Sequence, residues 1–153
     1  MTSKGEKANG ADLSQIFLKV TSVYFKLSAQ MDLALKPFGL TGSRMGVLRT
    51  LYDLGPATVS DIARMRPVSR QGVQRLSKEL TSSGLTRLTA SPDDGRSKIL
   101  ELTPKGRRLY ERAAEMRLEM LDELATEYSA VELNRLMSTL DQIEETVLRI
   151  EPT

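Results

Sequence analysis

The sequence contains no cysteine and no histidine. Without cysteine the chain has no disulfide, no thiolate metal site, no cysteine nucleophile and no thiol redox switch. Without histidine it has no histidine-ligated metal and no imidazole general base. Gly-rich phosphate loops and nucleophile elbows are missing as well. We therefore expect a protein that is not an enzyme and that holds neither a cofactor nor a metal.

Long apolar runs are also missing, since none approaches the roughly 20 residues that cross a bilayer. Residues 1–11 lack the apolar stretch of a signal peptide. With 153 residues, of which 40% are hydrophobic, the chain has the size and composition of one globular domain. These features predict a soluble cytoplasmic protein without a membrane segment.

The charge is small overall but uneven along the chain. The net charge of +2 comes from 22 Lys and Arg residues against 20 Asp and Glu residues. Residues 1–57 carry seven basic and four acidic groups, residues 58–108 carry eleven and five, and residues 109–153 carry four and eleven. The three parts therefore carry +3, +6 and −7. A basic middle and an acidic end predict a module for a polyanion, joined to a part with another role.

The first part of the chain predicts one long helix after a polar tail. Residues 1–11 are expected to be disordered. Asp12 and Gln15 have capping-box spacing, and the apolar residues after them predict a helix of about 25 residues that ends before Pro37. The apolar stripe of this helix comprises Phe17, Val20, Tyr24, Leu27, Met31, Ala34 and Phe38.

The last third predicts two more amphipathic helices, one from Pro104 to about Tyr128 and one capped by Ser129 with Glu132. The apolar stripes of the terminal helices either pack on the middle of their own chain or interleave with those of a second copy. Their coiled-coil-like spacing and the small size of the middle third favour the second arrangement. The C-terminal stripes comprise Leu109, Ala113, Met116, Met120 and Leu124, then Leu133, Leu136, Leu140, Ile143, Val147 and Ile150.

The middle of the chain predicts short elements in the order of a winged helix-turn-helix. Helices capped by Thr41, Thr58 and Ser69 precede two β-like runs, residues 85–90 and 98–102. A cluster of turn-forming residues separates the two runs. The predicted fold is therefore mainly α with a small β-hairpin wing, flanked by long N- and C-terminal dimerisation helices.

The helix capped by Ser69 carries side chains suited to DNA outside its buried stripe. Arginine can pair with guanine, glutamine can pair with adenine, and lysine or arginine can neutralise phosphate. Taken alone, the same side chains also fit an ordinary solvated helix face. They are Arg70, Gln71, Gln74, Arg75 and Lys78.

The hairpin favours the DNA-binding interpretation. Arg96 follows its turn, and Asp94, two residues back, is close enough to orient the guanidinium. Arginine suits a narrow minor groove, where the negative potential is strongest. An exposed Asp–Arg pair adds little stability, so stability is a weak reason for placing one there. The basic surface is extended by Lys98, Lys105, Arg107 and Arg108.

Several motifs occur together in the order and spacing of one known family. The wing turn reads Asp94-Gly95-Arg96-Ser97, and the entry to the following helix reads Leu102-Thr103-Pro104-Lys105-Gly106. The runs Gly39-Leu40-Thr41 and Val68-Ser69-Arg70-Gln71, with residues 80–85, also fit. Through these motifs the chain, over residues 12–150, resembles the MarR family of bacterial winged-helix transcription regulators, with its D-x-R wing signature and its L-T-x-x-G helix entry.

The resemblance implies a homodimer on double-stranded DNA, with recognition helices in successive major grooves and wing arginines in the flanking minor grooves. With it we expect four parts: a disordered tail over 1–11, a dimerisation helix over 12–38, a DNA-binding lobe over 39–103 and dimerisation helices over 104–153. The implied contacts to bases and phosphates are Ser69, Arg70, Gln71, Gln74, Arg75, Lys78 and Lys98, with Arg96 in the minor groove and Asp94 as its orienter.

One turn departs from the family pattern. Between the two helices of the motif an apolar residue is usually followed by glycine, but here the sequence reads Arg66-Pro67. We expect Met65 to supply the missing apolar contact and Arg66 to face phosphate.

Many regulators of this family release DNA when a small phenolic or aromatic carboxylate binds between the dimer helices and the DNA-binding lobe. Arg49, at the edge of an apolar stripe, could anchor such a carboxylate, with Met45, Tyr52 and Tyr110 lining a pocket. The same residues also fit an arginine that reaches solvent beside plain core.

The predicted function is a sequence-specific regulator, a repressor in the commoner mode, that binds a pseudo-palindromic operator. The alternative is a helical protein-interaction module that acts through its acidic C-terminal helices without specific DNA binding.

Overall fold

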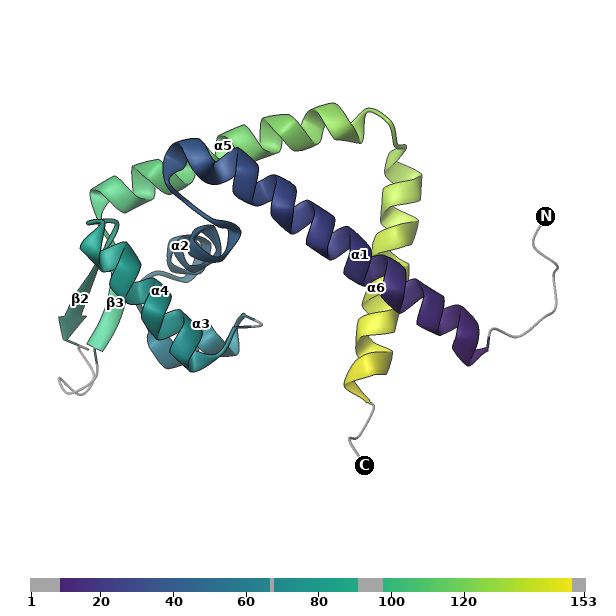
Figure 1. The fold of residues 1–153 in the computed structure, drawn as a ribbon, viewed down its shortest axis with the longest axis horizontal. Helices are drawn as coiled ribbons and strands as arrows, with labels where there is room; N and C mark the ends of the chain where they lie inside the picture. Colours follow the sequence, from purple (N-terminus) through teal and green to yellow (C-terminus); the bar gives the residue numbers. More distant parts are fainter. Residues whose placement is uncertain (1–8, 67, 91–97, 150–153) are drawn as a thin grey trace. The chain divides into compact units, whose positions relative to one another are not determined.

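The computed structural model describes residues 9–66, 68–90 and 98–149. Within them, the α-helices and three short strands follow in the order α1, α2, β1, α3, α4, β2, β3, α5, α6, with a short 3-10 helix, Lys36–Phe38, between α1 and α2 (Figure 1). The chain divides into two compact units, one ending at Ala113 and the other beginning at Ala114. No helix in the described ranges is both long enough and apolar enough to cross a membrane.

Helix α1 spans Gly10–Leu35 and begins earlier than its sequence pattern predicted. Its N-cap is Asn9, whose side chain accepts hydrogen bonds from the amides of Ala11 and Asp12. The Asp12 carboxylate in turn accepts from the amide of Asn9 at 3.0 Å. The predicted cap at Asp12 is therefore wrong, because Asp12 is the third-residue partner of a capping box that starts at Asn9. The predicted end before Pro37 is confirmed.

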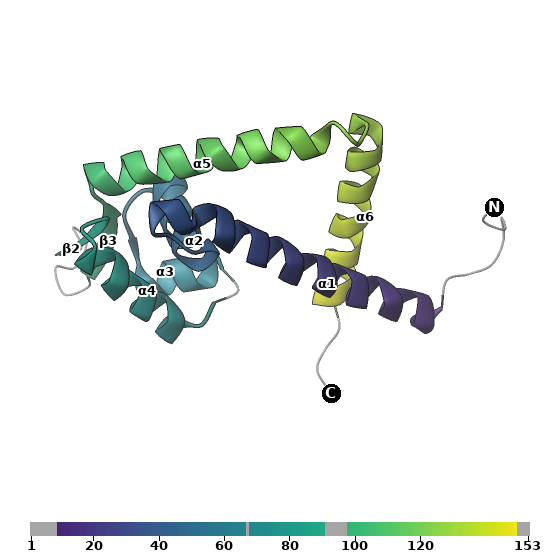
Figure 2. The same ribbon diagram turned by 45° about the horizontal axis from the view of Figure 1, so that its top comes forward.

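Three shorter helices form the lobe of the first unit: α2 over Gly42–Leu54, α3 over Val59–Arg64 and α4 over Arg70–Ser82. Their predicted caps are confirmed, since Thr41, Thr58 and Ser69 each accept a hydrogen bond from an amide in the first turn. Figure 2 shows α2, α3 and α4 gathered beside the strands. The core that they enclose comprises Val47, Leu48, Leu51, Ile62, Val73, Leu76, Leu80, Leu85 and Leu100.

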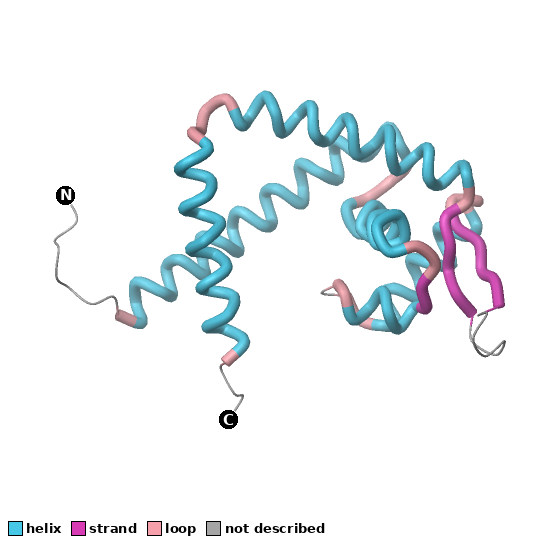
Figure 3. The backbone as a smooth tube through the Cα atoms, turned by 180° about the vertical axis from the view of Figure 1, so that it is seen from behind, coloured by secondary structure: helices cyan, strands magenta, loops and turns pink. Residues whose placement is uncertain are grey.

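The strands form an antiparallel sheet in the order β1-β3-β2 (Figure 3). Strands β2, over Thr86–Ala90, and β3, over Lys98–Leu102, form the predicted hairpin. Strand β1 was not predicted, because its two residues, Ala57–Thr58, are too few to show an alternating pattern. It pairs Ala57 with Leu100 and so ties the start of α3 to the return strand of the hairpin.

Helix α5 spans Pro104–Ala125 and starts in the first unit. A Cβ added at Gly106 would overlap the carbonyl of Leu85, so glycine permits the close approach of α5 to the start of β2. The helix ends three residues before the predicted end at Tyr128, because a turn already forms ahead of the next cap.

Helix α6, over Ala130–Leu148, lies in the second unit. Its predicted capping box is confirmed, with the Ser129 hydroxyl accepting from the Glu132 amide and the Glu132 carboxylate accepting from the Ser129 amide.

The turn between α3 and α4 differs from its prediction. Met65 is 59% exposed and does not supply an apolar contact to the core. Arg66 is half-buried instead, and a Cβ added at Gly46 of α2 would overlap its guanidinium. The arginine therefore folds onto α2, in the place where the family pattern has an apolar side chain.

Candidate nucleic-acid interface

Helix α4 is strongly amphipathic and packs one face into the lobe. Val73, Leu76 and Leu80 are buried, and Ser77 among them donates its hydroxyl to the carbonyl of Val73. The opposite face is exposed in the part of the chain that the structure describes. Its exposed residues are Ser69, Arg70, Gln71, Gln74, Arg75 and Lys78, which are the predicted base and phosphate contacts.

The exposed face of α4 is connected to α2 through Glu79. One carboxylate oxygen of Glu79 accepts from Nε of Arg44 at 3.1 Å and from Nη2 at 2.9 Å. Arg44 also donates to the carbonyl of Gly39. The other carboxylate oxygen of Glu79 lies 3.9 Å from Nε of Arg75. Among the described residues, Glu79 is the one acidic group that forms an ion pair with Arg75, and Arg44 holds that same carboxylate.

A polar cavity of about 310 Å³ opens between α3, α4 and β3. Of the described residues that line it, two are cations and none carries a carboxylate. A polar lining with two positive charges is complementary in charge to an anionic group such as a phosphate. Its lining residues are Thr58, Val59, Ser60, Arg70, Gln74 and Lys98.

Sequence analysis found three of these lining residues and missed the other three. Arg70, Gln74 and Lys98 were predicted DNA contacts, and the fold brings them together from two elements. Residues 58–60 were recognised only as a helix start. Their position beside α4 depends on the pairing of β1 with β3, for which the sequence gives no local signal.

Asp61, which contacts the cavity residue Thr58, is paired with side chains at the two ends of α3. Thr58 donates its hydroxyl to the Asp61 carboxylate at 2.6 Å, and Arg64 donates to the other carboxylate oxygen. The hydrogen bonds from Thr58 first, and then from Arg64, lower the pKa of Asp61. Its charge is thus paired locally.

The strands of the wing are described, but the tip is not. Arg87 and Glu101 are directly opposite on β2 and β3 and form an ion pair at 2.6 Å. Lys98, at the start of β3, is exposed. Asp94 and Arg96 lie outside the described residues, so their predicted roles stay predictions.

Two of the cations predicted to extend the basic surface make contacts within the lobe. Lys105 donates to the carbonyl of Ser83 at 3.0 Å, at the C-terminal end of α4. The Arg107 guanidinium lies over the ring of Tyr52, 4.9 Å from its centre. Arg108 is exposed without such a contact among those described.

The predicted effector residues lie on α2 and α5. Met45 is buried, and Arg49 forms an exposed ion pair with Asp53 at 3.4 Å. The rings of Tyr52 and Tyr110 are 4.6 Å apart and tilted by 37°. The fold thus brings the two tyrosines together, while the nearest charged partner of Arg49 is on its own helix.

Comparison with known proteins identifies the group to which this lobe belongs. Residues 38–97 match the sequence model of the MarR family. An uncharacterized protein of Mycobacterium tuberculosis is 33% identical over 113 residues, which are 74% of this chain and 76% of that protein. YdgJ of Bacillus subtilis, an uncharacterized HTH-type transcriptional regulator, is 26% identical over 113 residues, which are 74% of this chain and 69% of YdgJ.

The fold is shared with a solved member of the same group. MarR of Staphylococcus aureus, in complex with salicylate and kanamycin, superimposes with a TM-score of 0.79 at 23% identity, covering 91% of this chain and 95% of that one. Both have the winged-helix architecture that the motifs predicted. The match to the family model and the relative of 33% identity show that the chain belongs to the MarR family of transcriptional regulators.

Proposed function

We propose that this protein is a sequence-specific regulator that reads double-stranded DNA with α4. The observation that carries the proposal is the amphipathic α4, whose apolar face is buried and whose outer face holds only polar and cationic side chains at its N-terminal turns. A helix inserted in the major groove presents those turns to base edges. The base contacts assigned to it are Arg70, Gln71, Gln74 and Arg75.

The cavity beside α4 supports a phosphate contact next to the bases that are read. Arg70 and Lys98 supply positive charge, and Ser60 and Thr58 supply hydroxyl groups. Contacts of this kind fix the register of a protein on DNA without reading sequence. Ser69 and Lys78 are assigned to further phosphates, and Arg96, oriented by Asp94, to the minor groove.

We further propose that the protein binds DNA as a homodimer. Helix α1 carries ten exposed large apolar side chains and buries only Leu35, and α6, taken by itself, buries none of its residues. Exposed apolar surface of this extent is rare on soluble monomers, and a second copy offers the same complementary stripes. A two-fold dimer predicts a pseudo-palindromic operator with half-sites about 10 bp apart, centre to centre.

An aromatic or phenolic carboxylate is the proposed effector class, and repression the proposed output. The complex of the S. aureus relative with salicylate supports this class. In this chain the class is supported by Arg49 on α2, which also carries Met45 and Tyr52, and by the contact of the Tyr52 ring with Tyr110 of α5. Action on chromosomal DNA would place the protein in the cytoplasm.

The test begins with operator selection from random duplexes, followed by binding measurements across salt concentration. A DNA-binding dimer with about eight to twelve phosphate contacts is expected to show a slope of log K against log salt near −7 to −11. Arg75→Ala or Gln71→Ala is expected to relax base preference by about 1–3 kcal/mol at one position. Weak, salt-insensitive binding without a selected sequence would instead favour a helical protein-interaction module. A monomer at micromolar concentration in light scattering would contradict the dimer.

A further inference from the structure

Arg66 is a half-buried cation of the first unit to which the proposed function gives no role. It lies in the turn between α3 and α4, and its Nε is buried without a hydrogen-bond partner. Within the described ranges, no carboxylate forms an ion pair with it. The rest of the side chain is half-buried, but leaving even one buried donor without a partner is costly, because its lost hydration is not replaced. A charged group kept in a usually apolar place therefore calls for a compensating anion.

The residues around Arg66 leave space for its guanidinium, but they also include a second positive charge, that of Arg49. Its guanidinium lies against Gly46, in space that the Cβ of any larger residue at that position would overlap. Burial, followed by the charge of Arg49, lowers the pKa of Arg66, whereas Tyr24 of α1 raises it. Arg49 lies one turn beyond Gly46 on the same face of α2, where it pairs with Asp53. The group of two arginines and one aspartate carries a net charge of +1.

We propose that Arg66, assisted by Arg49, binds the carboxylate of a small organic acid at the face of α2 that carries Gly46. The planar guanidinium can donate two parallel hydrogen bonds to a carboxylate, and one negative charge neutralises the local excess. The proposal deepens the effector part of the proposed function, since it names a residue in the turn as the principal anchor. It does not depend on DNA binding, because its test uses the free protein.

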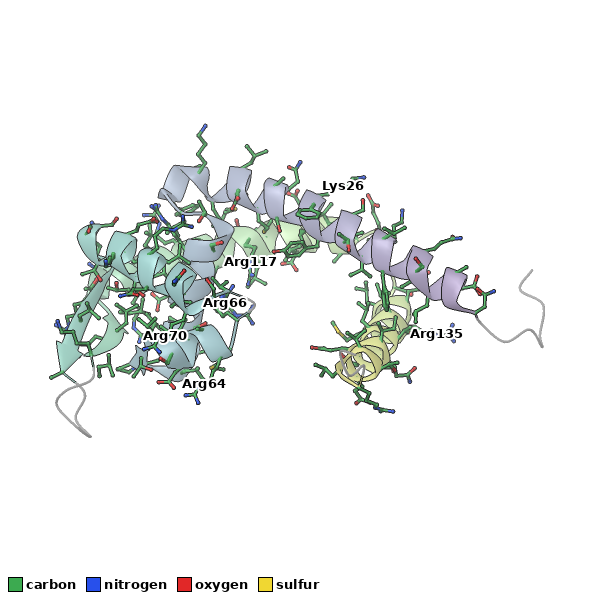
Figure 4. All side chains as sticks on the ribbon, turned by 60° about the horizontal axis from the view of Figure 1, so that its bottom comes forward. Lys26, Arg64, Arg66, Arg70, Arg117 and Arg135 are labelled. Carbon is green, nitrogen blue, oxygen red and sulfur yellow. The ribbon has the colours of Figure 1, made fainter. Side chains whose placement is uncertain are left out.

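DNA phosphate is a less suitable partner for Arg66. The cavity assigned to phosphate is lined from α3, α4 and β3 and shares no residue with the Arg66 surroundings. Arg64, Arg66 and Arg70 are close in sequence, but they come from α3, the turn and α4 respectively (Figure 4). Arg64 is paired with Asp61, and Arg70 lines the cavity, whereas Arg66 folds back onto α2.

The experiment measures binding of sodium benzoate and sodium acetate to the purified full chain by calorimetry and by thermal melting. Sodium chloride at matched ionic strength and benzamide, the neutral analogue of benzoate, are the reference solutes. At least one carboxylate is expected to bind saturably and to raise the melting temperature, because ligands of the folded state stabilise it. Benzamide is expected to give no comparable shift. If neither carboxylate exceeds chloride, the proposal is overturned.

Variants identify the anchor. Arg66→Leu restores an apolar turn, so it is expected to weaken carboxylate binding at least tenfold and to raise the melting temperature of the ligand-free protein by about 3 °C. Arg64→Ala, two residues earlier in the same region, is the matched control and is expected to bind carboxylate as the parent does. Equal binding by the Arg66→Leu and parent proteins overturns the proposal.

Other roles of Arg66 give different results. A ligand-free Arg66→Leu protein that melts lower or dissociates more readily would mean that Arg66 is compensated within the fold or by a second copy, and either result overturns the proposal. DNA binding can also be measured across salt concentration without any carboxylate. If the slope of log K against log salt is smaller by about one for Arg66→Leu than for the parent protein, Arg66 contacts a DNA phosphate and the proposal is overturned as well. Two further variants serve if Arg66→Leu does not fold. Arg66→Lys retains the charge and Gly46→Ala displaces the guanidinium, and both are expected to weaken carboxylate binding.

Discussion

The ion pair between Arg44 and Glu79 gives a sharp prediction about DNA binding. In Arg44→Met the Glu79 carboxylate loses two charge-assisted hydrogen bonds, and its remaining cationic neighbour is Arg75, 3.9 Å away. Because the side chains of Arg44 and Glu79 are 31% and 37% exposed, we expect a loss of about 1 kcal/mol in the free energy of unfolding. The freed carboxylate is expected to attract Arg75 by about 0.5–1 kcal/mol, which weakens operator binding about two- to fivefold.

The assay is fluorescence anisotropy on the selected operator, combined with urea unfolding of the same samples. Arg44→Met alone is expected to lose both stability and DNA affinity. Arg44→Met with Glu79→Gln is expected to regain DNA affinity, because the competing charge near Arg75 has been removed, but not the lost stability. If the double variant binds DNA as weakly as the single variant, Arg44 acts on DNA by another route and the reasoning fails.

Three further outcomes are expected. Because the Thr58 hydrogen bond lowers the pKa of Asp61, the stabilisation from its ionised form is full above about pH 4 and is lost as pH falls through the lowered pKa. Asp61→Asn should therefore lower the free energy of unfolding at neutral pH by only roughly 0.2–0.5 kcal/mol, because solvent screens these exposed groups, and should flatten the acid limb of a stability–pH profile; an unchanged limb would contradict this. Gly106→Ala is expected to lower the melting temperature clearly, whereas Gly10→Ala, which meets open space at the start of α1, should be neutral or stabilising. Lys98→Ala should weaken binding to all duplex sequences alike and reduce the salt slope by about one; a change in base preference would remove Lys98 from the phosphate contacts.

Helix caps were the most predictable part of the fold because their signals are local. Thr41, Thr58, Ser69 and Ser129 each precede an apolar 3,4 pattern directly, and a single side chain satisfies an amide within three residues. The start of α1 shows the limit of this signal. Asn9 and Asp12 are three residues apart, so Asp12 fits equally as a cap or as the partner of an earlier one.

The cavity beside α4 could be predicted only in part. The exposed face of α4 follows from one helical period, which is why Arg70 and Gln74 were found. Ser60 joins them because β1 pairs with β3, about forty residues further along the chain. A strand of two residues is too short for its pairing to be predicted from sequence. The prediction for the turn before α4 was wrong for a related reason. The sequence shows that Arg66 departs from the family pattern. It does not show where the guanidinium goes, because the space for it is left by Gly46 on another helix.

Helix α2 connects these observations, because three other segments of the first unit contact it between Gly42 and Gly46. The amide of Gly42 donates to Asp32 of α1 at 2.6 Å, Arg44 engages Glu79 of α4, and Gly46 receives Arg66 from the turn. An anion that binds the Arg66 guanidinium beside Gly46 therefore acts on the segment that joins α3 to α4, the helix that we propose reads DNA. If carboxylate binding lowers operator affinity by some factor, operator binding must lower carboxylate affinity by the same factor. Equal carboxylate affinity for free and operator-bound protein would mean that the Arg66 site binds its ligand without regulating DNA binding.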